Sequence, residues 1–450
     1  MTEARCNASA AAGGAAIRRA ATPRWAPPPA LRARLAVGPL VLGIACAPAA
    51  AAGARSVTEF GAAAAADDNA AAIQKGIDAV AAAGGGRLTI PEGAFRTGPI
   101  TLASGVELHL EAGSRLASVI APGHGGDADR DVPALVTIAN AENVSLTGEG
   151  TIDGRGEAWW SAFLAAKAAR QELRRPQLIR IDRSRNVELS GITTLNPPNT
   201  HVSARDSEDV AFRGLTMTAP DDSPNTDAIN LGRMRRVLIE RCIISTGDDN
   251  VAIIASGKPG DGAGSEDITV RDCRFGCGHG LSIGSYTQAG IRRLRVSNVT
   301  FDGTTSGIRL KSNAGRGGAV QDLEYRDLTM RNVRYPIFLA SHYPKLPASP
   351  GEATAVGTHL PRWSDILIEN VAIRDCRNGP VVWGLPEAPV ERLAFRRVTV
   401  ESDEGGVMVH AHATFDDSSM QPRTGPALRA FDAVVTGIET APLEGRYKPR

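Results

Sequence analysis

Residues 187–192 read Val-Glu-Leu-Ser-Gly-Ile, and the same pattern of apolar and polar residues returns seven more times along the chain. The later copies begin at Val210, Val237, Ile268, Leu294, Leu323, Ile366 and Leu393. Each copy is apolar-x-apolar, then two polar or glycine residues, then another apolar residue. This pattern is typical of two short strands joined by a tight bend.

The spacing of the copies decides between repeat folds. Successive copies start 23, 27, 31, 26, 29, 43 and 27 residues apart, whereas a propeller blade needs about 40–45 residues per repeat. A strand-bend-strand unit at the shorter spacing predicts the coils of a parallel β-helix, in which each coil is stabilised by stacking on its neighbours. We therefore predict an all-β chain with one parallel β-helix domain over residues 56–450. Cys242 and Cys273 occupy the apolar slot of their copies and are expected to be free core thiols, although Cys277 lies close enough in sequence to pair with Cys273.

The sequence also indicates how the two ends of this domain and its longest loops are built. Asp67 and Asp68 can cap a helix from Asn69 to about Val80, and such a helix would cover the open end of the stack. Insertions at 155–175 and 344–361 interrupt the coils and are expected to wall a groove. The first contains Trp159 and Trp160 and a helical run to about Leu173; we expect the tryptophans to pack the helix rather than to form a sugar-stacking platform. The tail beyond about Gly405 has weaker periodicity, and its structure stays open.

Charge and composition exclude several classes of protein. The chain has 50 Lys+Arg against 49 Asp+Glu, a net charge of +1, which argues against a nucleic-acid binder. Six cysteines in 450 residues exclude a disulfide scaffold. Residues 1–55 hold seven Arg, no Lys and one acidic residue, and Arg32 and Arg34 precede an apolar run and a row of small residues. This segment is predicted to be an export leader, so the mature protein is expected to be a secreted or periplasmic monomer without a membrane anchor.

Four short motifs carry the chemistry. They are Asn225-Thr226-Asp227, Gly247-Asp248-Asp249, Gly278-His279-Gly280 and Arg309-Leu310-Lys311, and each follows a different copy of the repeat. Because equivalent positions of neighbouring coils stack about 4.8 Å apart, the motifs are predicted to form one patch of three carboxylates, one imidazole and two cations.

Such a patch suits cleavage of a glycosidic bond in an acidic sugar polymer. Glycoside hydrolysis needs one protonated and one ionised carboxyl group, and closely spaced carboxylates raise the pKa of at least one member. Asp248 and Asp249 would point to opposite faces of a regular strand, so the backbone is expected to bend beside Gly247. Arg309 and Lys311 alternate on a strand, and two cations on one side indicate a substrate with carboxylates.

Each motif alone has a simpler interpretation. An Asp-Asp pair is usually a solvated turn, a glycine-flanked His is usually a turn residue, and Arg-x-Lys is usually a solvated face. Only their expected meeting at one level of the stack favours catalysis. A β-eliminating lyase on the same fold and a noncatalytic carbohydrate-binding β-helix remain alternatives.

The ordered set of motifs resembles that of the polygalacturonases, glycoside hydrolase family 28. The resemblance runs from about Val57 to at least Tyr343 and includes Arg175-Pro176. It implies a right-handed parallel β-helix, no metal or other cofactor, and hydrolysis of the α-1,4-galacturonosyl linkages of pectic polygalacturonan with inversion. It also implies roles for eight residues: Asp248 as general acid, Asp227 and Asp249 as bases that activate water, His279 as support for the acid, and Arg309, Lys311, Asn225 and Tyr343 as substrate-binding residues.

The chain departs from the family pattern at two places, and two properties stay open. Ala228 stands where a glycine is common, and Asn250 stands where a cysteine is frequent. Stacking alone would place Asp227 and Asp248 about one strand spacing apart, which favours retention, but we follow the family and expect inversion. The two insertions favour exo action over endo action.

Overall fold

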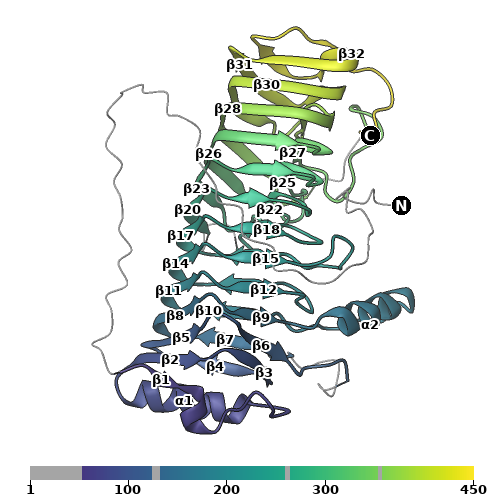
Figure 1. The fold of residues 1–450 in the computed structure, drawn as a ribbon. Helices are drawn as coiled ribbons and strands as arrows, with labels where there is room; N and C mark the ends of the chain where they lie inside the picture. Colours follow the sequence, from purple (N-terminus) through teal and green to yellow (C-terminus); the bar gives the residue numbers. More distant parts are fainter. Residues whose placement is uncertain (1–52, 124–131, 259–263, 353–356, 450) are drawn as a thin grey trace, which may run out of the picture.

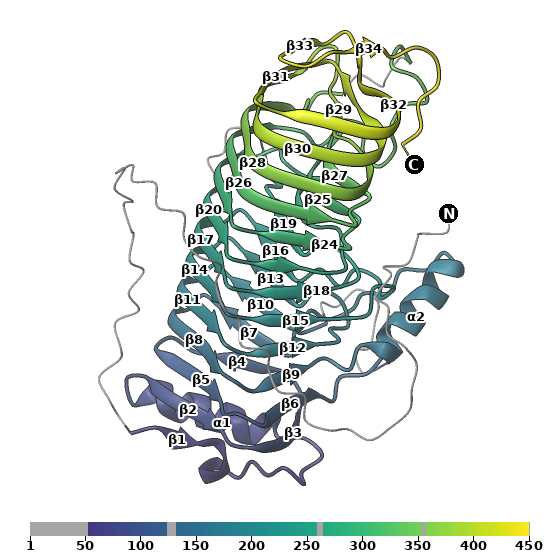
Figure 2. The same ribbon diagram turned by 45° about the horizontal axis from the view of Figure 1, so that its top comes forward.

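The computed structural model describes residues 53–123, 132–258, 264–352 and 357–449. In these ranges 34 strands form one continuous wrapped sheet, and every pairing between them is parallel (Figures 1 and 2). The coils stack along one axis as a right-handed parallel β-helix, so the predicted fold is confirmed. The predicted leader lies almost wholly in residues 1–52, outside the described ranges. Among the described residues, no helix has both the length and the apolar character that crossing a membrane requires.

Each coil has three faces. Face A consists of the strands β1 (Arg55–Ser56), β2 (Gly86–Ile90), β5 (Val106–Leu110), β8 (Glu142–Gly148), β11 (Arg185–Ser190), β14 (Glu208–Arg213), β17 (Arg235–Glu240), β20 (Ser265–Arg271) and β23 (Ile291–Ser297). Face B consists of β4 (Ile100–Leu102), β7 (Val136–Ala139), β10 (Ile179–Asp182), β13 (Val202–Arg205), β16 (Ile229–Gly232), β19 (Val251–Ile254), β22 (Leu281–Gly284), β25 (Ser306–Lys311), β27 (Tyr335–Ala340) and β29 (Val381–Trp383).

Face C and the last coils complete the stack. Face C consists of β3 (Gly93–Thr97), β6 (Ser114–Ser118), β9 (Thr151–Asp153), β12 (Thr193–Leu195), β15 (Thr216–Thr218), β18 (Ile243–Ser245), β21 (Arg274–Phe275) and β24 (Thr300–Asp302). Longer strands turn the corner between faces in the last coils: β26 (Ala319–Arg331), β28 (Arg362–Asn378) and β30 (Val390–Val409), followed by β31 (Ala411–Asp416), β32 (Ser419–Phe431), β33 (Val434–Thr436) and β34 (Ala441–Pro442). The tail therefore continues the β-helix.

The repeated six-residue pattern is the corner between faces A and C. The fifth residue of every copy has a positive φ between 51° and 75°, which turns the chain sharply. These residues are Gly191, Gly214, Arg241, Asp272, Asn298, Asp327, Asn370 and Arg397. Glycine, Asn and Asp adopt this left-handed conformation most easily, which explains why polar or glycine residues recur there. The predicted bend is confirmed, but the pattern did not reveal the strand of face B.

The core is built by equivalent residues that stack in register. Val210, Val237, Ile268 and Leu294 are paired from coil to coil and are buried. Cys242 and Cys273 lie in this core as free, buried thiols, as predicted. The alternative pairing of Cys273 with Cys277 is therefore wrong.

Two helices flank the stack. The helix α1 (Ala70–Ala82) follows the 3-10 turn η1 (Val57–Phe60) and buries Ile73, Ile77 and Val80 against the first coil, so the predicted capping helix is present. Asp68 Oδ1 accepts the Ala70 N–H at 2.9 Å. The helix α2 (Glu157–Ala168) lies in the first insertion and ends earlier than the predicted Leu173.

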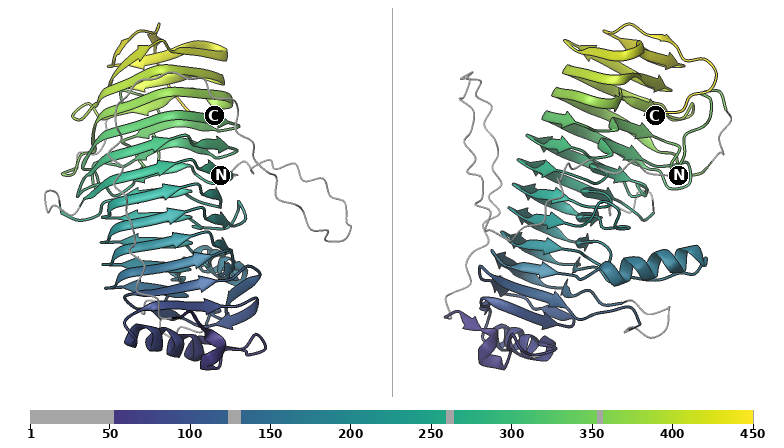
Figure 3. Two further views of the ribbon diagram at one scale, coloured as in Figure 1. Left: turned by 60° about the vertical axis from the view of Figure 1, so that its left-hand side comes forward. Right: turned by 45° about the vertical axis from the view of Figure 1, so that its right-hand side comes forward.

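The insertions leave the stack on the same side. Helix α2 projects between β9 and β10, and the segment that follows β27 projects farther along the axis (Figure 3). The tryptophans fix α2, because the Trp159 and Trp160 Nε1–H groups donate to Ile120 O at 3.2 Å and to Pro197 O at 2.9 Å, and both side chains are buried. Their packing role is confirmed. The second insertion has no helix or strand at 344–352 or 357–361.

Candidate active site

Face B brings the predicted site residues together. Ile229 pairs with Val251, and Val251 pairs with Leu281, so the residues just before these strands stack from coil to coil. The Ala228 N–H donates to Asp249 O at 3.0 Å and extends this register beyond the strand ends. Asp227 therefore stacks on Asp249 rather than on Asp248. The stacking argument for retention took Asp248 as the direct neighbour, whereas the backbone register gives that place to Asp249; inversion stays a prediction.

A tight turn places Asp248 and Asp249 on the same side. Carboxylate atoms of both residues and a ring nitrogen of His279 all lie within 4.8 Å of one another. The Asp249 N–H donates to Asp248 Oδ1 at 2.9 Å, which closes the turn. Gly247 is needed here for close approach, because a Cβ at this position would lie 2.2 Å from Ser223 O. The expected bend is present.

Asp249 is surrounded by donors. Its Oδ1 accepts from Ser282 Oγ at 2.6 Å and from Arg309 at 3.1 Å, and its Oδ2 accepts from Lys311 Nζ at 2.7 Å. Burial opposes ionisation of this carboxyl, but the charges of Lys311 and Arg309 outweigh it and hold the pKa of Asp249 well below its usual range. Asp249 is therefore a carboxylate at any ordinary working pH.

Asp248 is held from both sides. His279 Nδ1 lies 2.9 Å from Asp248 Oδ1, and Asn225 Nδ2 donates to Asp248 Oδ2 at 3.3 Å. The backbone of His279 is also held in place, because its N–H donates to Asp248 O at 2.9 Å. The next residue, Gly280, has a φ of 72°, and a Cβ there would lie 2.1 Å from Ser306 O. The glycine beside His279 is thus a requirement of the turn.

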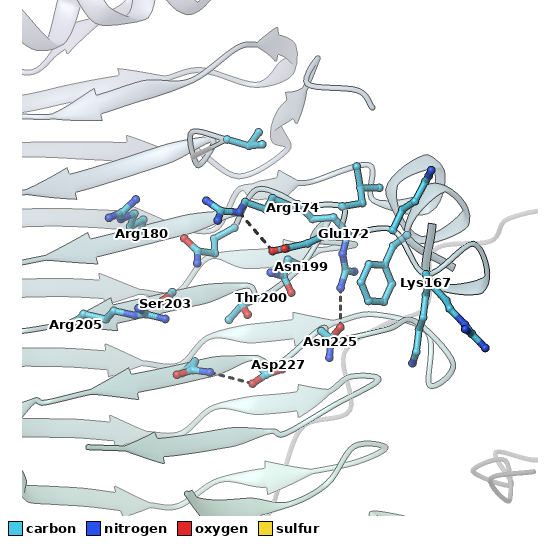
Figure 4. A pocket seen from close by; sticks show the side chains of 18 residues that line it. Lys167, Glu172, Arg174, Arg180, Asn199, Thr200, Ser203, Arg205, Asn225 and Asp227 are labelled. Carbon is cyan, nitrogen blue, oxygen red and sulfur yellow. Dashed lines mark hydrogen bonds and ion pairs between the residues drawn. The ribbon is translucent and has the colours of Figure 1, made fainter. Parts of the chain in front are cut away.

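Asp227 is half-buried, and its Oδ2 accepts a hydrogen bond from Asn230 Nδ2 at 3.1 Å (Figure 4). Burial and the negative charges of Asp248 and Asp249 raise the pKa of Asp227 well above its usual range. The three aspartates therefore combine a carboxyl whose pKa is lowered, Asp249, with one whose pKa is raised, Asp227, which is the behaviour expected of clustered acids.

The predicted substrate-binding cations lie deeper than expected. Arg309 and Lys311 do point to the same side of β25, but both contact Asp249, and Lys311 is buried. The Lys311 ammonium lies 5.6 Å from the centre of the Tyr343 ring. Tyr343 is held in place because its N–H donates to Ser312 O at 2.8 Å.

Sequence reasoning missed several residues that shape the site. Ser282 pairs in register with Arg309, which brings both to the same carboxylate. Asn250, one of the departures from the family pattern, is fully buried; its amide donates to Cys277 O at 2.9 Å and accepts the Gly280 N–H at 2.8 Å. Asn250 thus ties together the turn that carries His279. The alternation of polar residues in 228–232 and 280–284 is the only signal that could have pointed to Asn230 and Ser282.

The described part of the chain has one group of side chains whose spacing could hold a metal ion: Asp248, Asp249 and His279. The contacts of Asp249 disfavour this, since Ser282, Arg309 and Lys311 already engage both of its oxygens. That the enzyme needs no metal stays a prediction.

Two hollows flank the aspartates. One, of about 1000 Å³, lies between the first insertion and face B and is lined by Lys167, Arg170, Arg174, Arg175, Arg180 and Arg205 together with Asn225 and Asp227 (Figure 4). The other, of about 930 Å³, is lined by Gly247, His279, Arg309 and Tyr335 among others. The same hollow is lined by two acids, Glu172 and Asp227, and Arg174 and Arg180 pair with Glu172 and Asp182. The excess of basic side chains still favours an anionic ligand.

Comparison with known proteins agrees with this geometry. Residues 82–382 match the sequence profile of "Glycosyl hydrolases family 28". The chain belongs to glycoside hydrolase family 28. It is 32% identical over 329 residues to an endo-polygalacturonase of Pectobacterium carotovorum subsp. carotovorum, an alignment that covers 69% of this chain and 78% of the relative.

Solved structures of family 28 enzymes have the same fold. The Yersinia enterocolitica family 28 exopolygalacturonase superposes with a TM-score of 0.73 at 20% identity, over 86% of this chain and 79% of that one. The polygalacturonase of Erwinia carotovora ssp. carotovora gives a TM-score of 0.63 at 25% identity, over 83% and 92% of the two chains. The protein is thus a glycoside hydrolase, as the sequence predicted.

Proposed function

We propose that the protein is a polygalacturonase that hydrolyses α-1,4-galacturonosyl linkages of pectic polygalacturonan. The observation that carries the proposal is the carboxyl cluster of Asp227, Asp248 and Asp249 beside a hollow lined by six basic side chains. The cluster provides acid and base, and the cations suit a polymer with one carboxylate per sugar. The relatedness to a Pectobacterium endo-polygalacturonase supports this substrate class.

Asp248 is the proposed general acid. His279 and the Asp249 N–H both contact its Oδ1, whereas Asn225 is the one side chain among the described residues that donates to Oδ2. Oδ2 therefore keeps a position that can carry a proton to the leaving glycosidic oxygen. Asp249 and Asp227 are the proposed bases that position and activate water, and the permanent charge of Asp249 suits it to this role. His279 orients Asp248.

Asp227 is the competing candidate for the acid, because its pKa is raised. An aryl galacturonide with a weakly basic leaving group separates the two roles, since its departure needs no proton. Asp248→Asn should lose much less activity on this substrate than on polygalacturonate, whereas Asp227→Asn should lose similar activity on both. The reverse pattern would assign the acid to Asp227.

Four residues are proposed to contact the substrate, and their contributions to binding differ: Arg309, Lys311, Asn225 and Tyr343. Arg309 uses one nitrogen on Asp249 and has further donors for a substrate carboxylate. Lys311 is buried and acts mainly by keeping Asp249 ionised. Asn225 and Tyr343 lie at the surface of the site beside Asp248 and Lys311.

Exo action is proposed because α2 and residues 169–175 wall the cationic hollow on the side of the earlier coils. A wall there would stop a continuous polymer and admit a chain end. Product analysis by chromatography tests this directly: an exo enzyme releases one short product from the start of the reaction. A broad early distribution of oligogalacturonates would contradict exo action.

Two other functions are distinguished by one assay. A β-eliminating lyase forms an unsaturated product that absorbs ultraviolet light, and a noncatalytic carbohydrate-binding β-helix releases no reducing ends. We expect reducing ends, no ultraviolet absorbance and no effect of a chelator. Inversion is expected, and the anomer that forms first, observed by NMR, checks it.

Export of a soluble monomer completes the proposal. The leader is expected to be cleaved so that the mature protein begins between about Ala50 and Ser56. N-terminal sequencing of the exported protein measures this, and an intact leader on active protein from the cytoplasm would contradict it. Light scattering of the mature protein tests the monomer.

A further inference from the structure

We propose that Arg175 is a positioning residue that keeps the donor side of the Asn225 amide toward Asp248, so that the proton of Asp248 stays available to the leaving group. The inference rests on the proposed function and deepens it. Through Arg175, the first insertion thereby takes part in catalysis.

Arg175 is held at the centre of a network. Only 9% of the residue is exposed. One guanidinium nitrogen donates to Pro198 O at 2.9 Å and to Pro224 O at 2.7 Å, and the other terminal nitrogen donates to Asn225 Oδ1 at 2.7 Å. The guanidinium also lies 3.8 Å from the centre of the Phe163 ring on α2. The network thus connects helix α2, the turn before β13 and the turn that carries Asn225.

The contact with Arg175 decides which way the Asn225 amide faces. A guanidinium can only donate hydrogen bonds, so the atom 2.7 Å from it must be the amide oxygen. The NH₂ group of Asn225 therefore faces Asp248 Oδ2, at 3.3 Å. Asn225 itself is exposed, and without Arg175 its amide could turn over.

The orientation matters because of the Asp248 proton. A donor beside Asp248 Oδ2 cannot accept that proton. A reversed amide would present an acceptor, and the Asp248 O–H would then hydrogen-bond to Asn225 instead of to the glycosidic oxygen. Arg175 excludes this arrangement without contacting the substrate.

Arg175 also supplies charge to the cluster. The charged and titratable groups around Asp248 are His279, Asp249, Asp227 and Arg175. Burial lowers the pKa of Arg175 to about 10, against the opposing effect of the Asp227 and Asp248 charges, so it stays a cation at working pH. Its removal takes a positive charge away from Asp248 and Asp227, which should move the alkaline limb of the pH profile to higher pH.

The test compares Arg175→Met, Arg175→Lys and Asn225→Asp on two substrates, polygalacturonate and an aryl galacturonide with a weakly basic leaving group. Arg175→Met should lower kcat on polygalacturonate roughly 10- to 100-fold, the scale of a misplaced catalytic group, with a much smaller loss on the aryl substrate. Arg175→Lys keeps the charge without the fork of donors, so it should restore the pH profile but not kcat. Asn225→Asp presents an oxygen to Asp248 permanently and should copy the loss of Arg175→Met.

Arg213→Met is the matched control. Arg213 pairs with the buried Glu240 on face A and is itself half-buried. The Arg213→Met variant should lower Tm without changing the ratio of kcat on the two substrates or the pH profile.

Equal losses of kcat on both substrates in the Arg175 and Asn225 variants, or unchanged kcat in any folded variant of Arg175, would overturn the inference. If Arg175→Met does not fold, Arg175→Lys and Asn225→Asp decide. An inactive wild type would overturn the proposed function and this inference together, whereas an active wild type with unaffected variants overturns the inference alone.

Discussion

Lys311 and Asp249 form a buried ion pair, with Nζ 2.7 Å from Oδ2 and side chains that are 9% and 5% exposed. The lysine therefore compensates a charge of the enzyme itself. Removal of one partner of a buried pair leaves the other charge uncompensated, which is costly. Lys311 is thus expected to affect both the ionisation of Asp249 and the stability of the fold.

Lys311→Met should move the acidic limb of the kcat/KM profile to higher pH. Without the ammonium the pKa of Asp249 rises, so the base becomes protonated at a higher pH than in the wild type. Asp249 has a lowered pKa in the folded state, so its stabilising contribution is present above its unfolded pKa and is lost as pH falls through the folded value. Lys75→Met, at an exposed lysine on α1, is the control and should leave the profile unchanged. An unshifted limb in Lys311→Met would show that the ion pair does not set the ionisation of the base.

Arg309→Lys should be harmful although the charge is kept, because lysine cannot grip a carboxylate with two parallel hydrogen bonds. The expected loss is about 1.5–3 kcal/mol in kcat/KM on polygalacturonate, the scale of a hydrogen bond to a charged group. The loss should be smaller on methyl-esterified galacturonan, which lacks the carboxylate. Lys311→Met, by contrast, should reduce both activities alike. If Arg309→Lys keeps the wild-type ratio between the two polymers, Arg309 does not recognise the uronate.

The sequence predicted the stack because its core positions repeat at every corner between faces A and C. Face B was hidden, since its strands are short and only some of them alternate; residues 251–254, for example, read Val-Ala-Ile-Ile. For the same reason the sequence pattern made Asp248 the direct neighbour of Asp227 on the next coil. The register of face B makes Asp249 that neighbour. Contacts such as Ser282 with Asp249 join residues 33 positions apart across loops of unequal length. Only the three-dimensional register reveals them.

Asn250→Ala should lower activity and stability together. The variant loses the hydrogen bonds to Cys277 O and from Gly280 N that hold the turn around His279. Each buried group left without a partner costs about 1–3 kcal/mol, so Tm falls and kcat falls with it. Asn69→Ala is the matched control, because Asn69 also makes two backbone hydrogen bonds in a buried position, but at the N-terminal end of the stack. It should lower Tm and leave kcat of the folded enzyme unchanged; the same kcat loss in both variants would contradict a specific role for Asn250.

Glu240→Gln should destabilise the stack without affecting catalysis. The Glu240 side chain is 2% exposed and pairs with Arg213 and Arg271 on the neighbouring coils and with Arg241. Although burial opposes its ionisation, hydrogen bonds from Arg271 and Arg213 lower the pKa of Glu240, so the stabilisation is present above the unfolded pKa and is lost as pH falls through the folded one. Thermal unfolding at neutral and acidic pH measures this, with Glu391→Gln at an exposed ion pair as control. A Tm change no larger than that of the control would show that the ladder of ion pairs contributes little.

The most direct test of the whole account measures reducing ends released from polygalacturonate, in the presence of a chelator, by the wild type and by Asp248→Asn. The wild type should release reducing ends without ultraviolet-absorbing product. Asp248→Asn keeps the shape of the side chain but has no proton to donate, so its rate should fall by about 10²–10⁴ while its Tm stays close to that of the wild type. An ultraviolet-absorbing product, a loss of wild-type activity in the chelator, or near-normal activity in folded Asp248→Asn would contradict the account.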